Sequence, residues 1–269
     1  MYPIIHIGSI SVSSYYLFAV LAGLSGFILS VFSLRKPFGK RRSAVILPLL
    51  LVVSALLGAR LLNAILNPDA YPDMASVFEL QYKKMSLMGG LFLGFIVVLA
   101  SALITKNSPG VLGDRLTFPA FVGIVLLKIG CFLNGCCFGK PAKAPFGMVF
   151  PANKVKYQFI NWLPIVKPTS EYVYPTQLFE IGGAIIALLI ALAVRKVLKH
   201  RPGVFAAAFG ASFSLARLVI MPFRLWAYPD TVIHLLYPAF YILLIALGVG
   251  YILLTSKFSK SKYRKLPKT

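Results

Sequence analysis

Acidic residues are scarce in this chain. Of its 269 residues only 7 are Asp or Glu, against 28 Lys or Arg, and all charged residues together make up 13%. Soluble domains usually carry about 25% charged residues. The low charged fraction, with 58% hydrophobic residues and a mean hydropathy of +0.81, therefore excludes an ordinary soluble protein.

Cysteine and histidine are equally rare, with three of each. The cysteines Cys131, Cys136 and Cys137 lie within seven residues of one another. Their odd number excludes a fully paired disulfide framework, and three sulfurs without a neighbouring His make a poor zinc site. We therefore expect neither a metal nor a cofactor, and a bridge between Cys136 and Cys137 stays open.

Long apolar runs dominate the rest of the chain. A spanning helix needs about 20 mostly apolar residues, and such runs predict an all-α membrane bundle of seven transmembrane helices. The expected spans are about Tyr15–Phe32, Ser43–Leu66, Met85–Ile104, Leu116–Leu133, Tyr174–Val194, Gly203–Met221 and Val232–Leu254.

The net charge of +21 resembles that of a nucleic-acid binder, but such a protein gathers its cations on one soluble face. Here the cations cluster between spans, in segments 33–42 and 195–202 and in the tail after residue 256. These basic loops alternate with cation-poor ones, as the positive-inside rule expects. We predict an outside N-terminus, a cytoplasmic C-terminus and no nucleic-acid partner.

We expect a single integral membrane domain over 1–269, with segment 134–173 as a cap on its outer face. This loop is rich in Pro, Lys and aromatic residues, which hold a segment at the membrane interface. The aromatic residues include Phe146, Tyr157, Trp162 and Tyr172. No repeat of broken helices typical of a transporter is apparent.

Four cations lie near the outer ends of predicted spans: Arg60, Lys128, Arg217 and Arg224. Charges inside a membrane are costly and commonly serve an anion. Simple snorkelling to the headgroup region is the alternative. Arg217 and Arg224 are seven residues apart, which would place them on one helical face across Pro222.

Glu180 is the only acid inside a predicted span, one turn into the fifth helix after Pro175. It is predicted to orient an Arg guanidinium. An acid early in a helix is also favoured by the helix dipole alone. Several cations and one anion indicate a site for a phosphate.

Proton acceptors are harder to place. His200 is expected at the surface, whereas His6 and His234 lie near the outer face, and His234 follows Asp230 by one helical turn. An interfacial structural role is the alternative for both. The thiols of Cys136 and Cys137 are further candidates, if nearby cations depress a pKa.

Two glycine pairs stand out. Gly182-Gly183 is interpreted as close helix packing. Gly89-Gly90 begins its span, where we expect it to loosen the helix and present backbone amides to a ligand.

The candidate residues fall within six short motifs. They are Ile7–Val12 with Tyr15, Gly58–Leu61, Ser86–Leu91, Lys128–Gly139, Tyr174–Glu180, and Arg217–Arg224 with Pro229-Asp230. Over nearly the whole chain this set resembles the bacterial prolipoprotein diacylglyceryl transferases, with motifs similar to their G-x-R, H-G-G-L, R-I-G-N-F-I-N-G-E and P-S-Q-L-Y-E segments.

The resemblance implies a seven-span inner-membrane enzyme. Such an enzyme moves a diacylglyceryl group from phosphatidylglycerol to a lipoprotein-precursor cysteine and releases glycerol phosphate. Its partners would be a phospholipid donor, a lipoprotein precursor peptide and the membrane. The substrate-binding residues would be Tyr15, Arg60, Gly89, Gly90, Lys128, Asn134, Gly135, Gln177, Glu180, Arg217 and Arg224.

This chain departs from the family pattern at residues that handle protons. Met88 replaces the family His, Cys136 and Met221 replace two Glu, Lys128 replaces an Arg and Cys131 an Asn. His234, Cys136 and Cys137 are then the candidate catalytic residues. The rival hypotheses are a phospholipid-binding protein that kept the fold without the chemistry, and a transferase with another acceptor.

Overall fold

The computed structural model describes residues 2–264 except 9, 40, 69–70, 72, 79–85, 144, 151–171 and 226–229. Seven of its helices are long and apolar enough to cross a membrane, which confirms the predicted all-α bundle. The strands are β1 (Ile4–Ile7) and β2 (Ile10–Ser13). The helices are α1 (Ser14–Phe38), α2 (Arg41–Leu66), α3 (Met74–Phe78), α4 (Leu87–Thr105), α5 (Pro109–Asn134), α6 (Thr176–Val197), α7 (Val204–Ile220) and α8 (Tyr237–Arg264).

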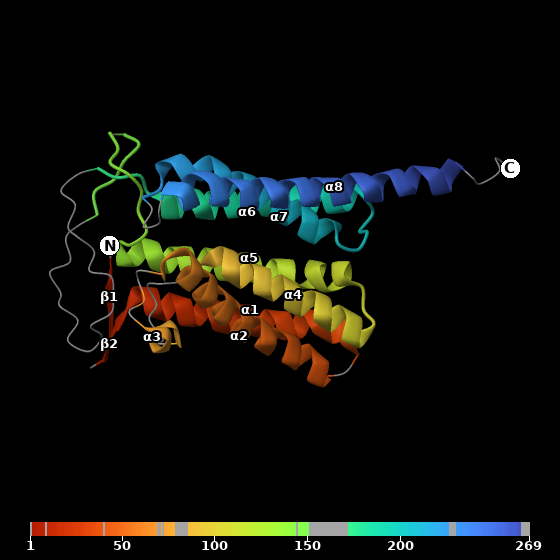
Figure 1. Cartoon of the computed structure of the whole chain (residues 1–269), viewed down its shortest axis with the longest axis horizontal. Coiled ribbons are helices and arrows are strands. Elements are labelled where there is room, and N and C mark those ends of the chain that lie inside the picture. Colours follow the sequence, from red (N-terminus) through yellow and green to blue (C-terminus); the bar gives the residue numbers. More distant parts are fainter. Residues whose placement is uncertain are drawn as a thin grey trace.

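The spans form two groups joined by α5 (Figure 1). In one group α1 packs along α5 and α2 along α4; in the other α7 lies between α6 and α8. α5 also contacts α6 and α7. The two termini lie at opposite ends of the bundle, as an odd number of spans requires, and the β1–β2 hairpin and α3 lie at the end that holds the N-terminus (Figure 1).

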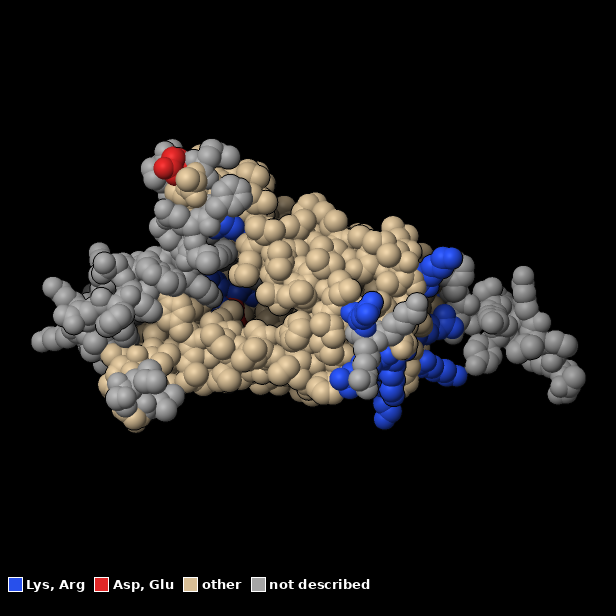
Figure 2. All heavy atoms as spheres, turned by 90° about the horizontal axis from the view of Figure 1, so that it is seen from below, with Lys and Arg blue, Asp and Glu red and all other residues tan. Residues whose placement is uncertain are grey.

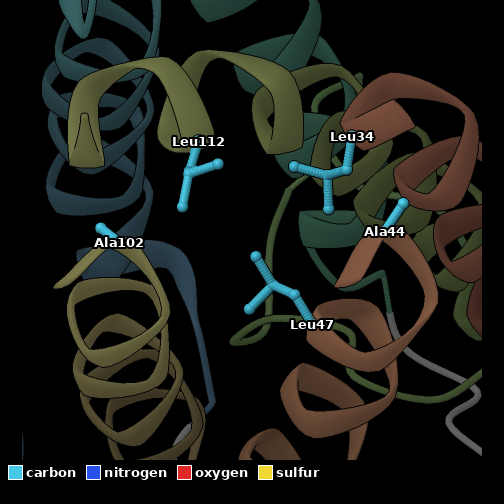
Figure 3. Packing of buried hydrophobic residues seen from close by; sticks show 5 residues of the cluster. All are labelled: Leu34, Ala44, Leu47, Ala102 and Leu112. Atoms are coloured by element: carbon cyan, nitrogen blue, oxygen red, sulfur yellow. The ribbon is translucent and has the colours of Figure 1, made fainter. Parts of the chain in front are cut away.

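Small residues and aliphatic side chains pack the interior. Leu34 of α1, Leu47 of α2, Ala102 of α4 and Leu112 of α5 converge with Ala44 near the far end of the first group (Figure 3). Many large apolar side chains elsewhere are exposed on the outside of the bundle. Such a surface suits lipid tails, which are as apolar as the side chains themselves.

The prediction that Gly89-Gly90 loosens its helix is wrong. Both residues lie in the regular first turn of α4. A Cβ on Gly89 would collide with the carbonyl oxygen of Gly58 in α2, and one on Gly58 with that of Gly89. Gly90 approaches Ala55 in the same way. The glycines therefore permit a close crossing of two backbones.

Close packing is confirmed for only one residue of the second glycine pair. A Cβ on Gly183 would come within 2.8 Å of the Cβ of Ala216 in α7, so the small residue is needed there. Nothing lies within 4 Å of the same position on Gly182. One glycine of the pair thus faces a helix and the other faces open space.

Three spans extend at least six residues beyond their predicted bounds, among them α8, which continues to Arg264 instead of Leu254. α1 continues through Lys36 and Pro37 to Phe38, and α5 begins at Pro109 instead of Leu116. Pro is compatible with a first helical turn. Within the added turn of α5, Asp114 accepts hydrogen bonds from the backbone N–H groups of Gly203 (2.8 Å) and Ala206 (2.9 Å) at the start of α7. Polar residues therefore extend this span because they bind a neighbouring helix end.

The two ends of the bundle differ in charge. Basic side chains gather at the end opposite the hairpin, where α8 continues beyond the other helices (Figure 2). Exposed basic residues at the helix ends and in the adjoining turns include Arg35, Lys36, Arg42, Lys106, Lys196 and Lys199. Of the predicted cap, Phe146 and Tyr172 are exposed, while Tyr157 and Trp162 lie outside the described residues.

Candidate functional site

Three cations converge on one buried carboxylate at the hairpin end of the bundle. Glu180, in the first turns of α6, is 1% exposed. Its Oε2 lies 2.8 Å from the Nζ of Lys128 in α5 and also pairs with Arg217 in α7, while its Oε1 pairs with Arg224. The sequence predicted these residues at one depth, and the structure brings them onto a single acid.

Arg217 and Arg224 reach Glu180 by a route that the sequence did not predict. α7 ends at Ile220, a 3-10 turn covers Met221–Phe223, and Arg224 is extended. The predicted shared helical face across Pro222 is therefore wrong. Pro222 helps to end the regular helix, and the bent chain carries the second guanidinium back to the carboxylate.

Backbone pairing fixes that bend. The N–H of Lys140 donates to the carbonyl of Phe223 at 2.9 Å, and the N–H of Gly139 donates to that of Tyr174 at 2.8 Å. Gly139 is close enough to this strand-like segment that a Cβ would collide with the Phe223 carbonyl. The segments before α6 and after α7 are thus tied to the turn after α5.

The cluster carries a surplus of positive charge. One carboxylate pairs with three cations, so these four described side chains together carry a net charge of two positive units. The side chains of Lys128 and Arg224 remain 15% and 17% exposed. Figure 2 shows basic atoms inside a hollow of the surface, away from the basic end of the bundle. A reachable cationic surplus at a membrane face is suited to an anionic ligand.

Arg217 has a second anchor that the sequence analysis missed. Its Nε and NH2 both donate to the hydroxyl of Tyr241 in α8 at 3.2 Å. Tyr237 and Tyr241 are one helical turn apart, so two polar aromatic side chains on one face of a span were the available signal.

Arg60 lies against a different element. Its Nε donates to the carbonyl of Val77 and its NH2 to that of Ser76, both at 2.8 Å, and its guanidinium lies 5.1 Å from the Tyr71 ring centroid. The last carbonyls of the short helix α3 have no intrahelical partners. They take up this guanidinium, which explains why Arg60 is not among the ion pairs to Glu180.

A cysteine-rich turn follows α5 directly. Gly135 caps the helix at a φ of 70°, and Cys137 also adopts a left-handed φ of 62°. This conformation is uncommon for a residue with a Cβ. The turn brings the sulfur atoms of Cys131, Cys136 and Cys137 within 4.8 Å of one another.

Two buried side chains of α6 hold this turn. Thr176 Oγ1 donates to the carbonyl of Cys137 at 2.8 Å, and Gln177 Nε2 donates to that of Cys136 at 2.6 Å. Gln177 Oε1 has no partner among the described residues. The Tyr174–Glu180 motif therefore positions both the carboxylate and the cysteine turn.

The three thiols differ in exposure, and the pKa values of two of them shift in opposite directions. Cys131 and Cys136 are buried against Tyr15, whereas Cys137 is exposed. Hydrogen bonds with the Cys131 and Cys137 thiols, together with burial, raise the pKa of Cys136. Hydrogen bonds from the other two thiols lower the pKa of Cys137, and the charges of Lys128 and Arg224 act in the same direction.

Of the other predicted residues, Asn134 lies at the cysteine turn, whereas His234 and His6 are exposed elsewhere. Asn134, the last residue of α5, accepts a hydrogen bond from Ser13 Oγ at 3.1 Å, which joins the cysteine turn to the hairpin. His234 is exposed on the π-helical turn Val232–Leu236, and Asp230 is exposed as well, without an ion pair between them in the described chain. His6 is exposed and pairs with Ser11 in the hairpin at 2.8 Å.

Met88 and Met221 belong to one apolar cluster. Met88 is buried with Val232 and Tyr241, and Met221 packs against the same group. Two of the departures from the family motifs thus occupy a common site beside Arg217. This region can pack a hydrocarbon chain or a helix, and its thioethers supply no proton acceptor.

Comparison with known sequences decides the family. A sequence model described as prolipoprotein diacylglyceryl transferase matches residues 3–259. The chain belongs to the prolipoprotein diacylglyceryl transferase family. It is 32% identical over 155 residues to the phosphatidylglycerol–prolipoprotein diacylglyceryl transferase of Bradyrhizobium diazoefficiens, which covers 56% of this chain and 50% of that protein.

Two further transferases of the same name show the same level of similarity. The Nitrobacter winogradskyi protein is 31% identical over 166 residues, covering 59% of this chain and 51% of its own length. The Tropheryma whipplei protein is 28% identical over 180 residues, covering 65% and 63% respectively. The chain thus spans about half the length of the first two relatives and somewhat more of the third.

Proposed function

We propose that this member of the prolipoprotein diacylglyceryl transferase family transfers the diacylglyceryl group of phosphatidylglycerol to a cysteine thiol of a lipoprotein precursor. The observation that carries the proposal is the surplus of positive charge around Glu180, contributed by three separate segments at one end of the bundle. The named relatives act on phosphatidylglycerol and prolipoprotein, and the anion that such a cluster fits is a phosphodiester headgroup.

The cations act on the phosphate. Lys128 and Arg224, which are partly exposed, contact the phosphate oxygens. The buried Arg217 adds positive charge from inside the bundle. Glu180 holds all three in place, so they need no rearrangement when charge develops on the leaving group. Gln177, Asn134, Gly135 and Tyr15 shape the wall next to the headgroup.

The transfer exchanges one bond for another. The acceptor sulfur donates its electron pair to the glyceryl carbon, and the C–S bond forms as the C–O bond to phosphate breaks. Glycerol phosphate leaves with the electron pair of that bond and is stabilised by the cations. The proton of the acceptor thiol passes to a side chain of this protein.

The proton acceptor is assigned among His234, Cys136 and Cys137. Of these, Cys137 is exposed next to the cationic cluster, and His234 is exposed on the turn before α8. Cys136 is buried next to the exposed Cys137, so a proton would reach it by way of Cys137. Arg60, Gly89 and Gly90 support α3 and the α2–α4 crossing, and their contribution to lipid binding is through that scaffold.

The basic end of the bundle indicates the orientation. Cytoplasmic loops carry an excess of Lys and Arg, so the basic end faces the cytoplasm of a bacterial inner membrane. The Glu180 cluster then faces outward, at the leaflet where a precursor emerges. The donor lipid and the precursor peptide would meet there.

A direct assay tests the transfer. The full chain, purified in detergent, is mixed with phosphatidylglycerol and a lipobox peptide, and the peptide mass is followed. An increase by one diacylglyceryl group, together with released glycerol phosphate, is expected. A peptide that stays unmodified where a related transferase modifies it would refute the activity.

Variants separate transfer from lipid binding. Lys128→Met should weaken both transfer and lipid binding. The matched change at Lys140, an exposed residue after the end of α5, should alter neither. Cys137→Ser and His234→Ala should slow transfer and leave lipid binding unchanged if either side chain takes the proton. If neither variant slows transfer, neither residue takes the proton.

A non-catalytic phospholipid-binding protein is the second candidate. The apolar packing of Met88 and Met221 beside Arg217 favours it, because neither side chain moves protons. Retained phosphatidylglycerol binding with no peptide product would support this candidate over the transferase.

A further inference from the structure

The cysteine turn forms a preorganised group of sulfur ligands. Cys131, Cys136 and Cys137 place their sulfur atoms within 4.8 Å of one another, and no other group of three metal-ligating side chains comes together in the described part of the chain. Two of the three residues are buried, and the third opens to the surface. The arrangement therefore has an interior and an entry side.

The backbone around these sulfurs is fixed. Cys136 N–H donates to the Cys131 carbonyl at 3.0 Å, which closes the helix end. The carbonyls of Cys136 and Cys137 are held by the buried side chains of Gln177 and Thr176. Cys137 keeps a left-handed φ of 62°, which turns its side chain back toward the other two. Rigid support of this kind is what a metal site requires of its surroundings.

Positively charged side chains lie beside the turn. Lys128 and Arg224, which contact Glu180, also act electrostatically on Cys137. Thiolate ligands bound to a metal ion would have these two cations nearby.

We propose that Cys131, Cys136 and Cys137 bind a soft monovalent metal ion, Cu(I), through three sulfur ligands. Thiolate ligands select Cu(I) and Zn²⁺ among the available ions. Structural Zn²⁺ takes four ligands. Only three come together among the residues that the structure describes, and three are enough for Cu(I). The prediction of no metal rested on the lack of a fourth zinc ligand, whereas the proximity of the three sulfur atoms appears only in the folded structure.

Metal binding is measured on the protein as it exists. The full chain is purified in detergent, reduced, stripped with a chelator and titrated with Cu(I) under anaerobic conditions against a chromophoric competitor. One Cu(I) per chain is expected. X-ray absorption of the complex should show a first shell of three sulfur atoms. A shell that contains nitrogen or oxygen would overturn the proposal.

Variants assign the ligands. Cys131→Ser, Cys136→Ser and Cys137→Ser should each weaken Cu(I) binding by at least about tenfold, since even loss of an outer-shell partner costs 10–100-fold. Met88→Leu is the matched control, because it removes a buried sulfur from another cluster and should leave the affinity unchanged. Equal Cu(I) uptake by the cysteine variants and the parent would mean adventitious binding only.

A measurement on the unaltered chain covers the case in which a variant fails to fold. Cu(I) should protect the exposed Cys137 of the folded protein from iodoacetamide, as counted by peptide mass. Freshly purified protein without reductant should also show three free thiols. A disulfide between two of them would overturn the proposed metal site, because too few thiolates would remain to bind the ion.

Discussion

Replacing Glu180 by Gln removes the anion on which three cations converge and keeps the shape of the side chain. Lys128, Arg217 and Arg224 would then face one another around a neutral amide in a buried site. The net charge of the cluster rises from two to three positive units. We expect a large loss of stability and a smaller effect on the attraction of an anionic lipid.

The magnitude follows from the burial. Glu180 is 1% exposed and Arg217 is 6% exposed. Removing one partner of a buried pair costs about 3–5 kcal/mol, because the remaining charge stays uncompensated. Lys128 and Arg224 can reach water at 15% and 17% exposure, so they relieve part of the repulsion. The loss should therefore lie near the lower end of that range.

The assay is the half-life of the folded protein in detergent at elevated temperature, since membrane proteins of this size unfold irreversibly. The half-life of Glu180→Gln should fall by more than tenfold, and addition of phosphatidylglycerol should restore part of it by supplying the missing negative charge. Asp114→Asn is the matched control, because Asp114 caps α7 through two backbone N–H groups. Its cost should stay near 1 kcal/mol, without rescue by the lipid. Equal half-lives for Glu180→Gln and the parent would refute this account of the cluster.

Three further changes test the packing, the Arg217 anchor and the thiol chemistry. Gly89→Ala should shorten the thermal half-life because its Cβ meets the Gly58 backbone, whereas Gly182→Ala, with open space around it, should leave the half-life equal or longer. Tyr241→Phe removes the hydroxyl that accepts from Arg217 and should cost about 1–3 kcal/mol, measured by the same half-life; an unchanged value would contradict the predicted role of that hydroxyl. In metal-free protein, alkylation of Cys137 by iodoacetamide should persist to pH values below the ordinary thiol pKa of about 8.5, because the reactive thiolate survives to lower pH when its pKa is depressed. The thiolate's stabilising contribution is present above the unfolded-state pKa and lost as pH falls through the folded value, so an ordinary alkylation profile would contradict the lowered pKa.

Several features could be predicted because they depend on composition and local sequence. Seven apolar runs, one intramembrane acid and the basic clusters between runs determine a seven-span bundle with a charged centre near one end. Motif similarity indicated the family before any coordinates. The ends of α1 at Phe38 and of α5 at Pro109 were not predicted, because both helices continue through polar residues beyond their apolar runs. At the start of α5, Asp114 binds the N-terminal end of α7.

Only the tertiary structure decided which charges meet. Arg60 sits at the same depth as Lys128 in the sequence pattern, yet the carbonyls of α3 take its guanidinium, while Arg224 reaches Glu180 through a bend that a helical period does not describe. The gathering of three sulfurs depends on a left-handed turn clamped from another helix. Sequence determines which segments enter the membrane, because each apolar run is transferred largely on its own. Pairing between segments depends on backbone carbonyls and bends, which no linear spacing encodes.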